Sequence, residues 1–141
     1  LQNNFAVYQD YALVGTKGFT FEGPFYLDRR GRIVDWDETR EQQAKKLVAR
    51  EAERLMQSFR QAEAAGYRKF IMFLHYPPTN VLEERSVFTD MAEAHGVSVV
   101  VYSHCHGERR FGDSLRGEHR GVQYRLVSGD YLRFKPEKIL E

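Results

Sequence analysis

Two uninterrupted apolar runs in the second half of the chain predict buried β-strands. Lys69–Leu74 and Val97–Tyr102 end in polar or turn-forming residues, and neither alternates between apolar and polar positions. Such runs are typical of parallel strands, which are covered on both faces. Between them, Ser86–His95 has apolar residues at helical spacing and predicts a short helix closed by Gly96. Its inward-facing residues are predicted to be Val87, Phe88, Met91 and Ala94. The order strand–loop–helix–strand predicts two neighbouring parallel strands joined by a right-handed crossover.

A longer helix is predicted from about Glu38 to Ala65, because apolar residues recur there every three or four positions. The apolar stripe consists of Ala44, Val48, Ala52, Leu55, Phe59 and Ala62. The opposite face carries charges of alternating sign, which is typical of a solvated surface. These charged residues are Glu41, Lys45, Lys46, Arg50, Glu53 and Arg60. Thr39 with Gln42 fits a capping box at the start, and Gly66 suits the left-handed position after the end.

Shorter patterns predict two hairpins at the ends of the chain. Phe5–Tyr8 and Tyr11–Val14 predict an N-terminal hairpin, followed by a long irregular loop to Trp36. Near the other end, Val122–Leu126 and Leu132–Lys135 alternate between apolar and polar residues and predict an antiparallel hairpin with one solvated face. Residues 107–121 between these regions are predicted to be a polar loop. We therefore expect residues 1–141 to form a single unit, an α/β fold with a mixed β-sheet and flanking helices.

Charge and cysteine content narrow the class of protein. The 21 Lys and Arg against 20 Asp and Glu give a net charge of +1, so the basic excess typical of nucleic-acid binding is absent. No apolar run is long enough to span a membrane. The single cysteine cannot form an internal disulfide, which favours a reducing compartment, and we expect a cytoplasmic location.

Three histidines follow the two buried strands. His75 comes directly after the first strand, and His104 and His106 lie just past the second. The carboxyl ends of neighbouring parallel strands meet at one edge of a sheet, and residues i and i+2 of an extended backbone project to the same side. Three imidazoles are a known zinc ligand set that leaves one position for a water molecule of lowered pKa. The pattern therefore predicts a metal site, although a histidine after an apolar strand is also often a hydrogen-bonded boundary residue.

Four segments, taken in order, resemble one protein family. They are Gly15–Gly18, Leu74–Asn80, Ser103–Gly107 and Val127–Pro136. Together they resemble the calcineurin-like metallophosphoesterases, in particular the small predicted phosphohydrolases of bacteria. The resemblance implies a fold like the C-terminal half of the metallo-dependent phosphatase α/β/β/α sandwich. It also implies hydrolysis of a small phosphoester substrate by water activated at a two-metal centre.

The resemblance assigns ligand roles and leaves part of the centre unaccounted for. It implies that His75 and His104 bind one of two divalent metal ions and His106 the other, without distinguishing Mn, Fe or Zn. The family's earlier motifs, Asp-x-His, a Gly-Asp pair and Gly-Asn-His-Asp, do not precede Gly15, and the first residue is Leu1. We therefore expect the chain to be the C-terminal portion of such a domain. It would be inactive or nearly so alone, and the intact protein active.

Several residues have weaker claims to function. Lys17 suits contact with a substrate phosphate, but a lone lysine near glycine is a weak signal. Asn80 and Asp130 lie in family-like segments, but both are standard turn formers, so we predict structural roles. Cys105 is predicted to point away from its neighbouring histidines. Helix-end or solvated roles are expected for His95, His119, Arg109 and Arg110.

Two further functions stay open from the residues alone. One is a self-sufficient mononuclear zinc hydrolase with three histidine ligands, which needs a general base that no nearby Asp or Glu clearly supplies. The other is a non-catalytic binding module on the same scaffold. If the chain is a portion of a domain, we also expect it to self-associate through exposed apolar sheet surface.

Overall fold

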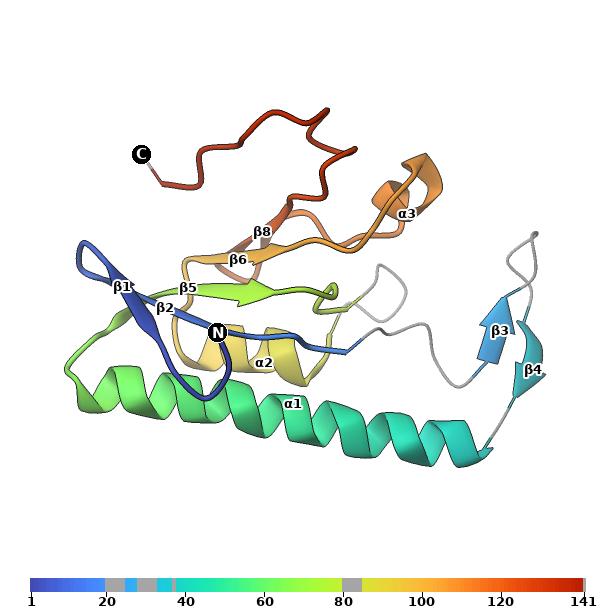
Figure 1. Cartoon of the computed structure of the whole chain (residues 1–141), viewed down its shortest axis with the longest axis horizontal. Helices are drawn as coiled ribbons and strands as arrows, with labels where there is room; N and C mark the ends of the chain where they lie inside the picture. Colours follow the sequence, from blue (N-terminus) through green and yellow to red (C-terminus); the bar gives the residue numbers. More distant parts are fainter. Residues whose placement is uncertain (20–24, 28–32, 37, 80–84, 141) are drawn as a thin grey trace.

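The computed structural model describes residues 1–19, 25–27, 33–36, 38–79 and 85–140. A six-stranded sheet has the order β1–β2–β5–β6–β8–β7, and Figure 1 labels all of these strands except β7. Its strands are β1 (Ala6–Tyr8), β2 (Tyr11–Thr16), β5 (Lys69–Leu74), β6 (Val99–Tyr102), β7 (Gly117–His119) and β8 (Val122–Leu126). Strands β2, β5, β6 and β8 are parallel, and β1 and β7 pair antiparallel at the two edges. The predicted α/β class with a mixed sheet is confirmed.

The predicted N-terminal hairpin is confirmed as β1 and β2, and β2 also pairs in parallel with β5. In the register of β2 with β5, Gly15 lies opposite Phe73. A Cβ atom at this glycine would lie 2.6 Å from the Phe73 carbonyl oxygen, closer than a carbon atom can approach. Position 15 therefore requires glycine for β2 to pair with β5 as it does.

Two helices cover one face of the sheet, α1 (Glu38–Ala64) and α2 (Val87–Ala94) (Figure 1). The predicted stripe of α1 faces inward, with Leu55 and Phe59 fully buried. Gly66 has φ +93° and donates its N–H to the Glu63 carbonyl, so the predicted left-handed end of the helix is confirmed. The predicted capping box at the start of α1 is in the wrong place, because Thr39 lies inside the first turn of the helix rather than before it.

Helix α2 is present as predicted, but its buried face is rotated. Ser86 is the N-cap, with a capping box. The buried residues are Phe88, Thr89, Met91 and Ala92. Val87 and Ala94, predicted to face inward, are exposed. Residues at i, i+1, i+3 and i+4 from Phe88 form a continuous helical face, and this rotation leaves Val87 and Ala94 outside it.

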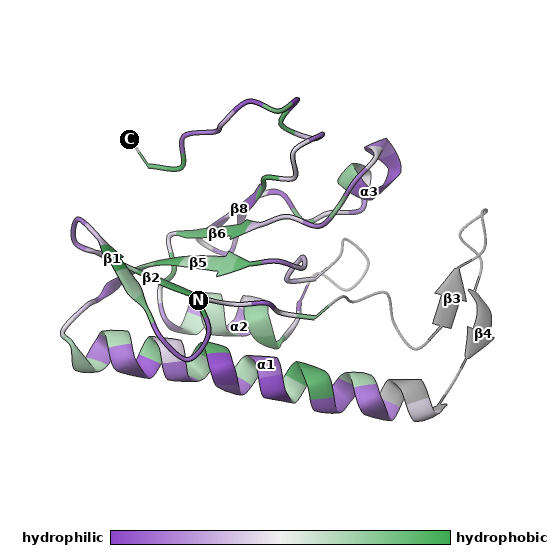
Figure 2. Ribbon diagram, viewed as in Figure 1, coloured by the Kyte–Doolittle hydropathy of each residue, from purple (hydrophilic) through white to green (hydrophobic). Residues whose placement is uncertain are grey.

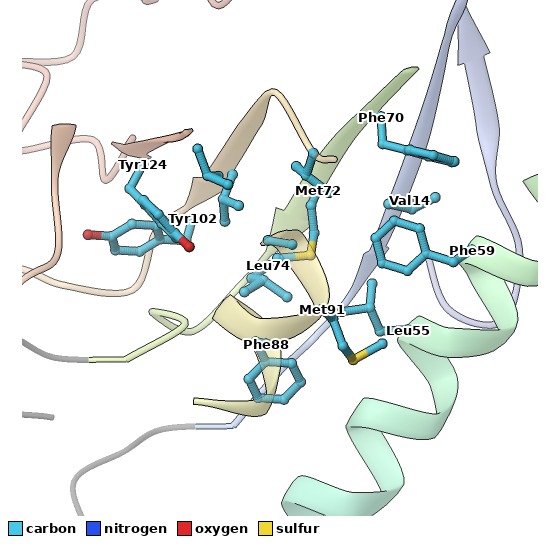
Figure 3. Close-up of a cluster of buried hydrophobic side chains, with 14 of the residues drawn as sticks. Val14, Leu55, Phe59, Phe70, Met72, Leu74, Phe88, Met91, Tyr102 and Tyr124 are labelled. Carbon is cyan, nitrogen blue, oxygen red and sulfur yellow. The ribbon is translucent and has the colours of Figure 1, made fainter. Parts of the chain in front are cut away.

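Apolar side chains are buried on both faces of the central strands, as the uninterrupted runs predicted. The ribbon of β5 and β6 is accordingly coloured hydrophobic (Figure 2). On the helix side, the strands pack Phe70, Met72 and Tyr102 against both helices (Figure 3). A smaller cluster on the other side contains the buried Ile71, Val99 and Val101. Partly buried residues around it are Tyr11, Leu13, Phe73, Val127, Ile139 and Leu140. The C-terminal segment thus lies on the face opposite the helices (Figure 1).

Two expectations about the connections are wrong. The stretch expected to be an irregular loop up to Trp36 contains an antiparallel pair, β3 (Phe25–Leu27) and β4 (Ile33–Trp36). The polar loop 107–121 contains a short helix, α3 (Glu108–Gly112), as well as β7. Strands β3 and β4 have only three and four residues, and α3 has no buried residue, so neither region leaves a strong periodic signal.

The predicted C-terminal hairpin is also wrong. Strand β8 alternates as predicted, but its neighbours are β6 and β7. Residues 128–135 form successive turns, with Arg133 and Phe134 at positive φ. Phe134 is 84% exposed, so the apparent alternation from Leu132 to Lys135 does not mark an inward face. Alternation predicts a half-buried strand but does not identify its partner.

Within the described residues, no helix combines the length and apolar character needed to cross a membrane. Cys105 is a free thiol and is buried against the helix-side core. Its side chain therefore points into the core, but not for the predicted reason, because His104 at φ +67° interrupts the extended backbone on which the prediction relied.

Candidate metal centre

Backbone hydrogen bonds tie together the carboxyl ends of three neighbouring strands, β2, β5 and β6. The Lys17 carbonyl, just past β2, accepts the N–H groups of His75 at 3.2 Å and Tyr76 at 3.1 Å. The His75 carbonyl, just past β5, accepts the Ser103 N–H at 3.2 Å and its hydroxyl at 3.3 Å. The Ser103 hydroxyl thus adds a second bond at this edge. The sheet register therefore continues for one residue beyond each strand.

This register brings two of the predicted histidines into contact. The ring centroids of His75 and His104 are 5.2 Å apart, with the ring planes at 63°. The Tyr76 ring lies 4.8 Å from His75 and 4.6 Å from His104. The Lys17 ammonium lies 5.7 Å from the centre of the Tyr76 ring. We call these four residues, Lys17, His75, Tyr76 and His104, the strand-end cluster.

The backbone after β6 is not extended, contrary to the prediction. His104 has φ +67°, a left-handed conformation that a non-glycine residue adopts at a cost of about 1 kcal/mol. The N–H of Cys105 donates to the Ser103 carbonyl at 2.8 Å, which closes a tight turn. The rule that residues i and i+2 project together therefore does not apply to His104 and His106. Instead, the turn directs His104 to the strand-end cluster.

His106 has a different partner, the carboxylate of Asp130. Its Nδ1 lies 2.9 Å from Asp130 Oδ1. The same carboxylate accepts the N–H of Gly107 at 2.9 Å and that of Tyr131 at 3.0 Å. Partial removal from water raises the pKa of this carboxyl, but the three N–H groups outweigh that effect and hold the pKa below its usual range. Asp130 is therefore ionised at neutral pH and acts as an acceptor toward all three groups.

The sequence interpretation treated Asp130 as a turn former and missed this contact. Strand β8 is a parallel neighbour of β6, so the residues after β8 reach the same edge of the sheet as His104 and His106. Once β8 is paired correctly, the strand-end argument that selected the histidines also selects Asp130. The missing signal was therefore the pairing of β8.

The imidazoles fit part of a metal centre. With a metal–nitrogen bond of about 2.1 Å, two imidazoles on one tetrahedral ion have centroids about 5 Å apart, close to the separation of His75 and His104. In the ranges that the structure describes, no group of three or more His, Cys, Asp or Glu side chains lies close enough to hold a metal ion. The chain thus offers one adjacent pair of imidazoles and, beside Asp130, a third.

A buried carboxylate supports the strand-end cluster from the helix side. Glu51 of α1 is 1% exposed. Its Oε2 accepts the Thr16 hydroxyl at 2.6 Å, and its Oε1 accepts Arg54 at 2.8 Å. Thr16 is the last residue of β2 and precedes Lys17, so this bond anchors the strand end to α1. Sequence periodicity missed Glu51 because a charged residue on a charge-rich helix predicts a solvated position.

The weaker candidates have structural contacts or exposed positions. His95 stacks on Phe59 at 4.0 Å between centroids, and its Nδ1 lies 2.6 Å from Glu63 Oε1, so it joins α2 to α1. His119 donates its Nε2–H to the Arg116 carbonyl at 2.8 Å. Arg109 and Arg110 are exposed on α3, and Asn80 lies outside the described residues.

Comparisons of the chain with models of known protein families, with curated proteins and with solved structures find no match.

Proposed function

We propose that this chain forms part of a metal-dependent phosphoester hydrolase of the calcineurin-like type. The observation that carries the proposal is the contact between His75 and His104 at the carboxyl ends of adjacent parallel strands. Ligand sites of open α/β sheets occupy this edge, and neutral imidazole is the commonest protein ligand of transition metals. The four family-like segments, in the family's order, add the reaction class.

The proposal gives each residue of the edge a task. His75 and His104 would hold one divalent ion, and His106 would belong to the second. When bound, two such ions supply an activated water molecule and neutralise charge on the phosphoryl group. The Lys17 ammonium, at the same edge, would attract the phosphate of a small phosphoester substrate. Imidazole ligands favour Zn and Fe, whereas carboxylate ligands favour Mn. Because the complete centre would contain both kinds of ligand, the proposal leaves the metal open among these three.

The centre would be completed by ligands outside these residues. A bridging carboxylate is needed to hold two ions, and the described part of the chain contains no group of three potential ligands. We therefore propose that the missing ligands lie in the Asp-x-His, Gly-Asp and Gly-Asn-His-Asp motifs of a longer protein. The six-stranded sheet would then be one half of a two-sheet sandwich, and its partly buried Tyr11, Leu13 and Phe73 would face the other half.

Metal titration of the chain tests the ligand assignment. After mild chelation, the chain is titrated with Co²⁺ and Zn²⁺, and binding is followed by Co²⁺ absorption and calorimetry. We expect binding that is lost in His75→Ala and in His104→Ala. The control His119→Ala removes a histidine that bonds a backbone carbonyl, and should bind as the parent does. A chain that binds no ion, or binds equally well without His75 and His104, would contradict the proposal and favour a non-catalytic module.

A colorimetric phosphoester assay tests the partial centre. The 141-residue chain with Mn²⁺ or Zn²⁺ should show no turnover above buffer with the same ions. A longer product that also carries the missing motifs ahead of Leu1 should turn over, and His75→Ala should abolish its turnover. Robust turnover by the chain alone would contradict the proposal that it carries only part of the centre. If that turnover required only Zn²⁺ and all three histidines, it would favour the mononuclear zinc hydrolase.

A further inference from the structure

The segment after β8 folds back across the turn that carries His106. Asp130 lies 24 residues from His106 in sequence, and its carboxylate contacts the ring of that histidine and the backbone N–H of the next residue, Gly107. A turn former needs bonds within its own turn, and the Tyr131 N–H supplies one. The two bonds to residues 106 and 107 are not needed for the turn. They join one strand end to the next.

The hydrogen-bonding chemistry of this contact determines which ring nitrogen is free. An ionised carboxylate only accepts hydrogen bonds, so Nδ1 of His106 carries the hydrogen and donates to Asp130. In the neutral ring, the lone pair then lies on Nε2, at the far side of the ring from Asp130. Metal-binding histidines in proteins commonly have this arrangement, with one nitrogen held by a carboxylate and the other bound to the ion.

His106 depends on this contact more than His75 depends on any one of its contacts. Its side chain is 67% exposed, and among the residues that the structure describes its ring has one polar partner, Asp130. His75, by contrast, contacts two aromatic rings and is held by backbone bonds on both sides. An exposed ring with a single anchor has access to other rotamers when that anchor is removed.

We infer that Asp130 is the positioning residue of His106, which it holds in the Nδ1–H tautomer so that Nε2 is presented to a divalent cation. The metal part of this inference rests on the proposed function, whereas the tautomer part does not. Loss of a carboxylate that orients a ligating histidine typically lowers metal affinity 10–100-fold, roughly the effect expected here.

Nitrogen NMR of the metal-free chain tests the positioning directly. Two-bond ¹H–¹⁵N correlation spectra at pH 8 report which nitrogen of His106 is protonated. The parent should show mainly the Nδ1–H tautomer. In Asp130→Asn the amide can donate to Nδ1, so the population should move to the Nε2–H tautomer. Asp130→Ser keeps a turn-forming side chain that is too short to reach the ring, and should also lose the preference. Asp113→Asn, an exposed acid at the end of α3, is the matched control and should leave it unchanged.

Zinc titration followed at the His106 ring nitrogens tests the metal part. The Zn²⁺ concentration at half-saturation should rise about 10–100-fold in Asp130→Asn and Asp130→Ser, and should not change in Asp113→Asn. Amide spectra establish which variants are folded. If either folded Asp130 variant keeps the parent tautomer, the positioning role is overturned. If the tautomer changes but the parent shows no Zn²⁺ response at His106, the metal part of this inference fails and the positioning of the ring stands, while the test of the proposed function remains the binding at His75 and His104.

Discussion

Two buried tyrosines on neighbouring strands differ in one respect that predicts opposite effects of the same substitution. Tyr102 of β6 is 0% exposed and Tyr124 of β8 is 1% exposed (Figure 3). The Tyr102 hydroxyl donates to the Leu115 carbonyl. Within the described part of the chain, the Tyr124 hydroxyl has no hydrogen-bond partner. Replacing each tyrosine by phenylalanine keeps the ring and removes only the hydroxyl.

The free energies follow from this difference. Burying a hydroxyl without a partner costs about 1–3 kcal/mol, so Tyr124→Phe removes an unfavourable group and should stabilise the fold by about 1 kcal/mol. Tyr102→Phe loses a hydrogen bond and leaves the Leu115 carbonyl unpaired, which should destabilise the fold by about 1–3 kcal/mol. The two variants should therefore differ by about 2–4 kcal/mol in free energy of unfolding, well above the error of the measurement.

Urea denaturation followed by far-UV circular dichroism measures this difference. Equal m-values for the three proteins establish that the change lies in stability rather than in the extent of unfolding. If Tyr124→Phe is destabilised as much as Tyr102→Phe, the Tyr124 hydroxyl has a partner after all, and the reasoning is refuted.

The same tyrosine predicts how stability changes at alkaline pH. Burial raises the pKa of Tyr124 to about 12. Because this pKa is above the value of about 10 in the unfolded chain, the stabilisation is complete below pH 10 and is lost as pH rises through 12. The midpoint urea concentration should fall over this interval. It should fall less in Tyr124→Phe, and an identical fall in both proteins would contradict the assignment.

Three further predictions concern the helix anchor, the first strand and the open sheet face. Thr16→Val removes the hydroxyl that bonds buried Glu51 and should lower the free energy of unfolding by about 1.5–3 kcal/mol; a loss below about 0.5 kcal/mol would contradict the anchor. The hydrogen bond from Lys69 holds the pKa of Asp10 below its usual range, so Lys69→Met should raise it in a carboxyl NMR titration. The associated stabilisation is present above about pH 4 and is lost as pH falls through the folded-state pKa, and an unchanged Asp10 titration would argue against the pair. The chain should self-associate with increasing concentration in sedimentation experiments, and Leu13→Gln, on the sheet face opposite the helices, should reduce that association.

Local patterns in the sequence determined the elements that bury the most apolar surface. The runs of β5 and β6 have no polar interruption, and a strand with that pattern is stable only where both faces are covered. The stripe of α1 likewise has one side that must be buried. These features depend on residues close together in sequence, so periodicity alone predicted them.

Pairing between distant segments could not be predicted in the same way. The alternation of β8 was recognised, but the choice between Leu132–Lys135 and the β6–β7 pair depends on how strands far apart in sequence fit together. The same limitation applied to α2, where the crossover contacts with the sheet determine which of two overlapping helical faces is buried.

The candidate site likewise has features that local sequence predicted and features that depend on contacts between distant segments. The sequence by itself placed His75 and His104 at one edge of the sheet, because each follows a parallel strand and neighbouring parallel strands end at one edge. The left-handed turn at His104, the bond between His106 and Asp130 and the buried Glu51 were decided by tertiary structure. Each of these depends on a hydrogen bond or a packing contact between segments whose proximity no local pattern records.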